Sequence, residues 1–290
     1  MSTAIEQSVR VACLWEVRAR KAGNVCPHRE FADLTVNDFF CSADAIAPIL
    51  AEATERPLGV TIRRAIEATR AVVTTNTNLG IVLLLAPLAA APADESLVVG
   101  VSRILAATTR NDAAEVFAAI RIANPGGLGN VSSEDVHSEP TQTLRDVMTL
   151  ARERDLIAAQ YASGFALVLG EMLPTFRDRF RKCGVVEQAI VDLQLATLAR
   201  WPDSLIARKL GLEIAEEVRR RACVVVENGG TATPAYREFD AWLRGDGHRR
   251  NPGTTADLIA ATLFAALREG VVDASAAFDW AAHPFTQGTT

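Results

Sequence analysis

The sequence of 290 residues contains 49% hydrophobic and 22% charged residues, and its formal net charge at pH 7 is −5. These values are ordinary for a globular protein and allow one large domain or two small ones. The negative net charge argues against nonspecific binding of nucleic acid, which requires a basic surface. The five cysteines show no pairing pattern, and their odd number fits reduced thiols in the cytoplasm better than a disulfide framework.

Residues 79–92 form the most apolar run of the chain, LGIVLLLAPLAAAP. This run is shorter than the roughly 20 residues that a membrane-spanning helix needs, so it predicts a buried core helix. The first 20 residues lack the basic segment followed by an apolar segment that marks a signal peptide. We therefore expect a soluble, cytoplasmic protein that binds neither a membrane nor nucleic acid.

Helical periodicity dominates the sequence, whereas strand-like alternation is nearly absent. Besides the apolar run, the pattern predicts helices over residues 4–20, 36–53, 59–73, 96–109, 110–123, 141–173, 185–201, 204–228, 234–246 and 254–270. We therefore predict an all-α protein of about ten helices, folded as a single domain over residues 1–290.

Several of these segments carry signals that modify the helical prediction. Residues 141–173 are long enough to be broken near Gly164, and residues 204–228 form either two helices or one bent helix. Residues 223–230, CVVVENGG, are the one candidate for a strand. Asn37 or Asp38 is the expected cap of the helix over 36–53.

The first irregular segment, residues 21–35, begins with the turn KAGNV. Gly23 would let the backbone approach a phosphate closely, with Lys21 supplying charge and Asn24 an amide. The same residues also fit an ordinary helix end, and the residues alone leave both interpretations open. A zinc site at Cys26 and His28 is disfavoured, because Cys-x-His is not a usual zinc spacing.

Residues 74–78, TTNTN, form a polar cluster directly before the apolar run. One helix cap needs a single such residue, and here there are five. A helix N-terminus lined with Asn and Thr is also a natural site for an anion or a nucleotide.

Two other segments each allow a structural and a functional interpretation. Residues 124–136 are rich in glycine but lack the ending of a P-loop, so they predict a mobile loop over a site or a surface turn. Asp155 lies between charged and apolar residues, where it fits an ion pair with Arg152, a magnesium ligand or a base.

A turn near the C-terminus brings basic residues close to a carboxylate. Arg249 and Arg250 precede Asn251–Gly253, and Thr254 or Thr255 then caps a helix whose first turn holds Asp257. This is a good helix N-terminus by itself. It also fits a basic turn and a carboxylate that face one pocket.

Three of these segments together resemble the triphosphoribosyl-dephospho-CoA synthase family. The family has a Lys-Pro-Gly-Asn-Val turn followed by an Asp, and this chain has KAGNV followed by FAD. It has Thr-Asn-Thr-His-x-Gly where this chain has TNTNLG, and Ser-Pro-Gly-Gly-x-Ala-Asp-Leu-Leu-Ala where this chain has NPGTTADLIA. Each motif is weak alone, but the ordered set spans residues 21 to 260.

The resemblance implies an all-helical enzyme that binds ATP with Mg²⁺ and transfers its ribosyl triphosphate, with loss of adenine, to dephospho-CoA. The expected partners are therefore ATP and a CoA-like or other small acceptor, and a homodimer is compatible with the sequence. As catalytic residues and metal ligands we predict Asp33, Asp155 and Asp257. For nucleotide binding we predict Lys21, Gly23, Asn24, His28, Asn76, Asn78, Gly80, Arg249, Asn251 and Gly253.

The chain departs from the family pattern at several positions. Ala22 replaces a proline and Asn78 replaces a histidine, and two central family motifs, His-Gly-Glu and Gly-Ala-Arg-Gly-Glu-Ala, are missing. Asp203 and Arg208 are kept from a further motif. The departures favour a related transfer to another acceptor, or alternatively a nucleotide-binding protein that has lost the activity.

Overall fold

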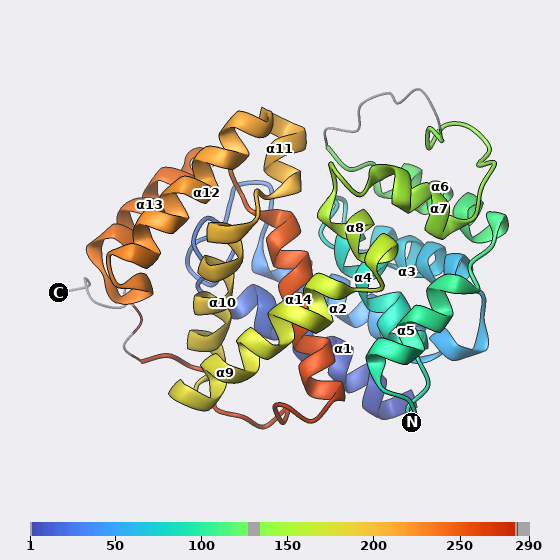
Figure 1. The fold of residues 1–290 in the computed structure, drawn as a ribbon, viewed down its shortest axis with the longest axis horizontal. Coiled ribbons are helices and arrows are strands. Elements are labelled where there is room, and N and C mark those ends of the chain that lie inside the picture. Colours follow the sequence, from blue (N-terminus) through green and yellow to red (C-terminus); the bar gives the residue numbers. More distant parts are fainter. Residues whose placement is uncertain (1, 127–133, 282, 284–290) are drawn as a thin grey trace.

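The computed structural model describes residues 2–126, 134–281 and 283, and in these ranges it is almost entirely helical (Figure 1). The all-α prediction is confirmed. The helices are α1 Ser2–Arg18, α2 Val36–Ala51, α3 Leu58–Val72, α4 Leu79–Ala90, α5 Leu97–Ala106, α6 Arg110–Ala123, α7 Leu144–Ala151, α8 Leu156–Ser163, α9 Leu173–Cys183, α10 Val186–Arg200, α11 Ser204–Leu210, α12 Leu212–Glu227, α13 Pro234–Arg244 and α14 Gly253–Arg268. The short strand β1 covers Gly245–His248.

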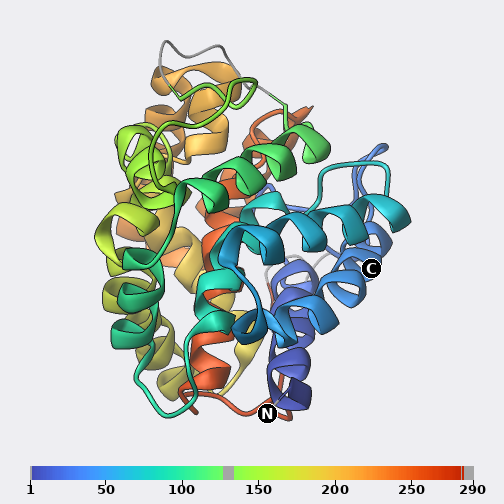
Figure 2. The same cartoon turned by 90° about the vertical axis from the view of Figure 1, so that its right-hand side faces the viewer.

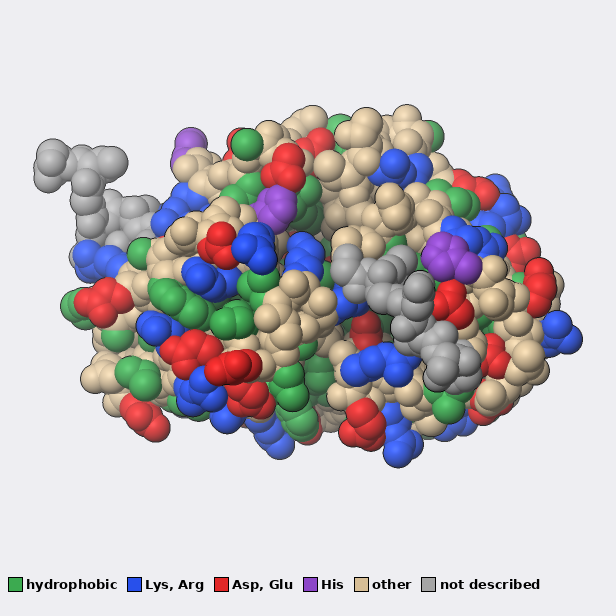
Figure 3. All heavy atoms as spheres, turned by 90° about the horizontal axis from the view of Figure 1, so that it is seen from above, with side chains coloured by type: hydrophobic (Ala, Val, Ile, Leu, Met, Phe, Trp, Pro, Cys, Tyr) green, Lys and Arg blue, Asp and Glu red, His purple; other side chains and the backbone are tan. Residues whose placement is uncertain are grey.

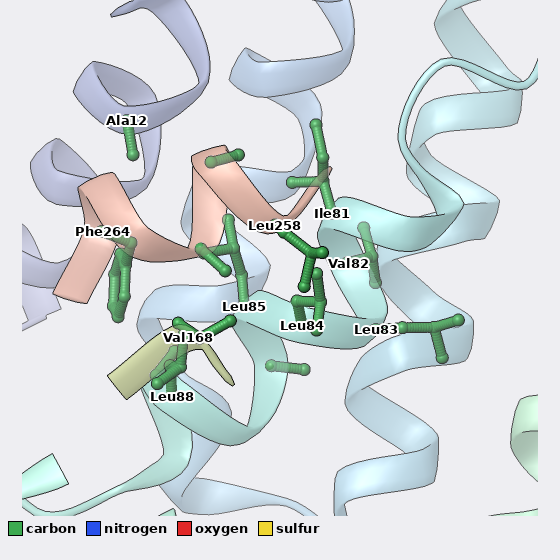
Figure 4. Close-up of a cluster of buried hydrophobic side chains, with 14 of the residues drawn as sticks. Ala12, Ile81, Val82, Leu83, Leu84, Leu85, Leu88, Val168, Leu258 and Phe264 are labelled. Atoms are coloured by element: carbon green, nitrogen blue, oxygen red, sulfur yellow. The ribbon is translucent and has the colours of Figure 1, made fainter. Parts of the chain in front are cut away.

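The apolar run forms α4, and all twelve of its residues are buried, which confirms the predicted core helix. A helix that is apolar on every side must be covered on every side. Helices α2, α3, α5 and α14 pack around it, and Figure 4 shows its leucines interlocking with Leu258 and Phe264 of α14.

Helix α14 lies in the middle of the molecule and joins its two halves. It contacts α1 and α4 on one side and α9, α10 and α11 on the other. Figure 1 shows it between α10 and α4, and in Figure 2, seen from the side, it lies behind helices coloured blue to green. Most of the buried hydrophobic residues form one large cluster around α4 and α14, and a smaller cluster joins α10, α11, α12 and α13.

Fourteen helices appear in the described ranges instead of about ten, because single periodic segments are divided. The chain turns at Gly164, as predicted, and bends by 91° between α8 and the segment Val168–Cys183. A second break, at residues 152–155, separates α7 from α8 and was not predicted. Residues 204–228 form two helices that meet at Gly211, whose φ of 93° suits a glycine.

Two local predictions were wrong. The strand candidate 223–230 is mostly helical, because α12 continues to Glu227 and buries Val225. The cap of α2 is Thr35, which accepts from the N–H of Asp38 while the Asp38 carboxylate accepts from the N–H of Thr35. This reciprocal capping box places Asp38 inside the first turn.

Length and apolar character together decide whether a helix can cross a membrane. Within the described ranges no single helix combines the length and the apolar character needed to cross a membrane. One bent pair, Leu156–Ser163 with Val168–Cys183, meets the length and composition criterion only when the two are taken together.

The segment that follows α1 is fastened to the other half of the molecule by a buried ion pair. Glu187 of α10 accepts from Arg20 Nε and Nη2, both at 2.6 Å, and from the N–H of Trp280 at 2.8 Å. Burial by itself raises the pKa of the Glu187 carboxyl, but these hydrogen bonds and the Arg20 charge outweigh it and hold the pKa below 4.5. These hydrogen bonds of Glu187 therefore join the segment after α1 to α10 and to the C-terminal segment at Trp280.

This contact predicts a pH-dependent contribution to stability. Because the pKa of Glu187 is lower in the folded protein, its contribution is complete above pH 4.5 and is lost as the pH falls through the folded-state pKa. Glu187→Gln should lower the free energy of unfolding by about 1–3 kcal/mol at neutral pH, and by clearly less near about pH 3. Urea unfolding at both pH values measures this, with the exposed Asp178→Asn as control. If the free energies of unfolding of wild type and Glu187→Gln differ by the same amount at both pH values, the prediction is contradicted.

Candidate functional site

One large cavity, of about 1190 Å³, opens between the two halves of the molecule. Its walls come from the end of α1, the turn after it, the α3–α4 connection, helices α6, α7, α8 and α11, and the start of α14. Figure 3 looks down on this side of the molecule, where acidic and basic side chains gather between the two groups of helices. The volume exceeds the roughly 300–1,000 Å³ of a typical small-ligand pocket, so it has room for two ligands.

The carboxyl group of Asp257, near the start of α14, lines the cavity. It lies directly against α4, since a Cβ added to Gly80 would be 2.0 Å from Asp257 Oδ2. Burial, followed by the charges of Glu16, Asp203 and Asp155, raises the pKa of Asp257 well above its ordinary value, while Arg208 lowers it. Asp257 therefore holds a proton more firmly than an exposed carboxyl group does.

Asp155 lies on the same wall of the cavity and is fixed by α8. Its Oδ1 accepts from the N–H groups of Ile157 and Ala158, so it is the N-cap of that helix. Its Oδ2 is 3.4 Å from Arg208 Nη1 on α11. The partner of Asp155 is thus Arg208, while Arg152 pairs with Glu153.

Basic side chains surround the outer part of the cavity. They come from the end of α3, the α7–α8 connection and α11, and they are Arg70, Arg152, Arg154, Arg208 and Lys209. Burial and the adjacent Arg208 lower the pKa of Lys209. Because these cations line one opening, they form a suitable surface for a polyanion.

The turn predicted to bind phosphate is held in place by a buried amide network. Asn24 Nδ2 donates to Asn251 Oδ1 at 2.6 Å, and Asn24 Oδ1 accepts from Gln194 Nε2 at 2.7 Å. Asn24 and Asn251 both line the cavity. These bonds join the turn after α1 to the turn before α14, so the two motifs noted in the sequence meet in space.

Lys21 does not line the cavity, and its charge is neutralised inside the protein. The side chain is fully buried, lies 2.9 Å from Glu16 Oε1 and also donates to the carbonyl oxygens of Glu16 and Ala19. Glu16 itself does line the cavity. Lys21 therefore acts on the site through Glu16, which it holds in place.

The α3–α4 connection forms a further wall. Asn76 Oδ1 accepts from the N–H of Leu79 at 3.2 Å, and so gives one of the free N–H groups at the start of α4 a hydrogen-bond partner. Asn78 and Gly80 also line the cavity. Gly80 leaves the space that the Asp257 carboxylate occupies, which gives this glycine a specific steric role.

The remaining predicted residues divide between the cavity and its surroundings. Gly253 and Asp33 line the cavity, and Asp33 pairs with His248 at 3.0 Å. Gly23, with φ of 73°, packs against Leu243 instead, too tightly for any side chain. Two more predicted residues lie outside the cavity, namely His28 and Arg249.

The predicted metal ligands do not form a ready-made metal site. In the described part of the chain no group of three His, Cys, Asp or Glu side chains is arranged to hold a metal ion. Asp33 lies with His248, apart from the pair Asp155 and Asp257. Mg²⁺ commonly binds through one or two carboxylates together with substrate phosphates, and Asp155 and Asp257 fit that mode.

Sequence reasoning missed Glu16, Arg70 and Lys209. Glu16 lies within the amphipathic pattern of the first helix and has no motif around it. Its buried position against Lys21 depends on how the chain turns after α1, and the sequence gives no sign of this. Of the glycine-rich loop over residues 124–136, the end near Asn124 and the segment 134–136 line the cavity, and residues 127–133 lie outside the described ranges.

Comparison with known proteins connects this geometry to a family. The family model CitG, described as ATP:dephospho-CoA triphosphoribosyl transferase, matches residues 2–275. The chain belongs to this family. The three motifs noted in the sequence therefore reflect family membership, and in space they meet around one cavity.

Individual relatives agree with the family match. Two curated proteins named "Probable 2-(5''-triphosphoribosyl)-3'-dephosphocoenzyme-A synthase" are similar to this chain over part of their length. The protein from Stutzerimonas stutzeri is 36% identical over 108 residues. The protein from Pseudomonas putida is 37% identical over 111 residues. Each alignment covers 36% of this chain and spans 37% and 38% of those proteins. A crystal structure described as a putative triphosphoribosyl-dephospho-coA synthase from Archaeoglobus fulgidus has a TM-score of 0.63 and 29% identity, and covers 80% of this chain and 99% of that one.

The buried pair Lys21–Glu16 predicts a large effect on stability. Lys21→Met leaves the Glu16 carboxylate buried without its cation, near Asp257, and should lower the free energy of unfolding by about 3–5 kcal/mol. Urea unfolding measures this, and Lys182→Met, at an exposed lysine, is the matched control. The double variant with Glu16→Gln should recover part of the loss. Equal stability of the Lys21 and Lys182 variants would contradict the pairing.

Proposed function

We propose that this protein is a Mg²⁺-ATP-dependent transferase that joins the ribose C1 of ATP to a hydroxyl group of dephospho-CoA, or of a closely related acceptor, and releases adenine. The observation that carries the proposal is one large cavity lined by both carboxylates and cations, in a chain that belongs to this family. Charge of both signs within one cavity suits a substrate whose triphosphate and sugar need opposite surroundings.

The distribution of charge suggests how ATP lies in the cavity. Its triphosphate would be near the cations Arg154, Arg208 and Lys209, which can neutralise it. Its ribose would then lie between α4 and α14, beside Asp257. The apolar side chains of α6 and α7 offer a place for the adenine base.

The carboxylates have a role in breaking the N-glycosidic bond. As adenine leaves, the ribose gains oxocarbenium character, which nearby carboxylates such as Asp155 and Asp257 stabilise electrostatically. The acceptor hydroxyl loses its proton as it attacks C1, and an ionised Asp257 beside the ribose would receive that proton. The departing adenine carries away the electron pair of the bond that breaks.

Mg²⁺ would enter the site with the phosphates of ATP, held by Asp155 or Asp257 as the protein ligand. When bound, it supplies charge neutralisation to the triphosphate.

The opening of the cavity has features that suit a coenzyme A-like acceptor. Leu150 and Leu212 both line it although their side chains are exposed, and the half-buried Trp201 lies on the same lining. Exposed apolar side chains at the opening of a cavity indicate a binding surface. Together with Arg154 and Lys209, they fit an acceptor that has both an apolar arm and phosphates.

The proposal is tested by incubating the protein with Mg²⁺-ATP and dephospho-CoA and measuring free adenine by chromatography. Wild type should release adenine and form a product of the combined mass. Asp257→Asn should lower the rate by about 100-fold or more, because it removes the proton acceptor, and the exposed Asp178→Asn should not change it. ATP binding without any release of adenine would favour a family member that has lost its activity, and would contradict the proposal.

A further inference from the structure

The side-chain amide of Asn78 is buried at the cavity with only one of its two polar atoms paired. Asn78 is 3% exposed and lines the cavity. Its Nδ2 donates to Thr69 Oγ1 at 2.9 Å, whereas its Oδ1 has no hydrogen-bond partner among the described residues. A buried acceptor without a partner is costly, so this atom is suited to a donor that a ligand brings.

The orientation of this amide is fixed by the neighbouring helix. Thr69 Oγ1 donates its only proton to the carbonyl oxygen of Ala65, 3.1 Å away. The same oxygen can then only accept from Asn78, so the NH₂ group of Asn78 must point toward α3. The carbonyl oxygen Oδ1 is consequently the atom left for a ligand.

Hydrogen-bond donors line the same cavity as this acceptor. The first-turn N–H groups of an α-helix have no acceptor within the helix, and Gly80 and Ile81 of α4 line the same cavity. Thr75 Oγ1 is also buried without a partner in the described part of the chain, and Thr75 lines the cavity too. An acceptor next to donors is the complement of an adenine edge, which presents the N6 amino group beside a ring nitrogen.

The surroundings of Asn78 are compatible with a flat aromatic ring. Helix α3, to which Asn78 is bonded, packs against α6. The residues of α6 that line the cavity are all apolar, namely Val116, Phe117, Ile120 and Ala123. An apolar wall with a few fixed polar atoms is the usual form of a base-binding pocket.

We propose that Asn78 selects the base of the nucleotide donor, by accepting a hydrogen bond from the 6-amino group of adenine through Oδ1. The inference rests on the proposed function and adds to it the residue that distinguishes ATP from 6-oxopurine nucleotides. Inosine triphosphate places a carbonyl oxygen where ATP has the amino group, so two acceptors would face each other. Thr69 is a positioning residue, because it keeps the Asn78 amide from turning over.

Calorimetric titration with ATP and with inosine triphosphate, without an acceptor present, tests this directly. Wild type should bind ATP about 10- to 100-fold more tightly, as expected for one base-specific contact. Asn78→Leu should bring the two affinities within about 3-fold of each other, mainly by weakening ATP binding. Retention of the wild-type preference for ATP would overturn the proposal.

A second variant leaves Asn78 itself intact. Thr69→Val frees the amide to turn and present Nδ2 to a 6-oxo group, so it should reduce the preference for ATP by strengthening the binding of inosine triphosphate. Thr197→Val is the matched control, since Thr197 makes the same bond within its helix, to Leu193, and does not line the cavity. Equal preferences in these two variants would overturn the role of Thr69.

Two other outcomes have separate meanings. If Asn78→Leu alters the preference of ATP over 2′-deoxy-ATP but not over inosine triphosphate, Asn78 contacts the sugar and the inference is wrong. If wild type binds neither nucleotide, the proposed function is contradicted before base selection arises.

Discussion

The close crossing of α4 and α14 is the contact on which the site depends. Both helices begin at the cavity, and there the carboxylate of Asp257 occupies the space that the absent side chain of Gly80 leaves. Farther along, the same two helices form the centre of the hydrophobic core (Figure 4). The burial of an entirely apolar helix thus provides the energy that holds a carboxylate in partly desolvated surroundings.

Polar contacts between distant parts of the chain complete this arrangement. Asn24 bonds Asn251, and Asp203 at the start of α11 accepts from both the N–H and the hydroxyl of Thr255 in α14. These bonds attach the turn after α1 and the start of α11 to the beginning of α14, and so hold three parts of the cavity wall together. Because the groups involved are buried and paired, they favour one arrangement of the walls over others.

Much of the fold follows from the sequence because its apolar periodicity is strong. The buried helix within residues 79–92 and the break at Gly164 both rest on local signals that the structure repeats. The break before Asp155 was missed, because a charged run can continue a helix as well as end one. The cap Thr35 was missed because it lies just ahead of Asp38, the more obvious acidic residue of its capping box.

The site was less predictable than the fold, and the reason is geometric. The motifs identified Asn24, Asn78, Gly80 and Asp257, which line one cavity. A motif does not show which of its residues face the ligand and which hold the turn. Gly23 and Lys21 hold the turn, because Gly23 packs tightly against Leu243 and Lys21 forms a buried ion pair with Glu16.

The most direct test of the account is a crystal structure of the Asp257→Asn variant with Mg²⁺-ATP bound. The account predicts that the ribose lies between Gly80 and position 257, with C1 within about 3–4 Å of a carboxylate or of the substituted side chain. It also predicts that the triphosphate extends toward Arg208 and Lys209. A nucleotide bound outside this cavity, or one whose triphosphate lies against Glu16 and away from Arg208 and Lys209, would contradict it.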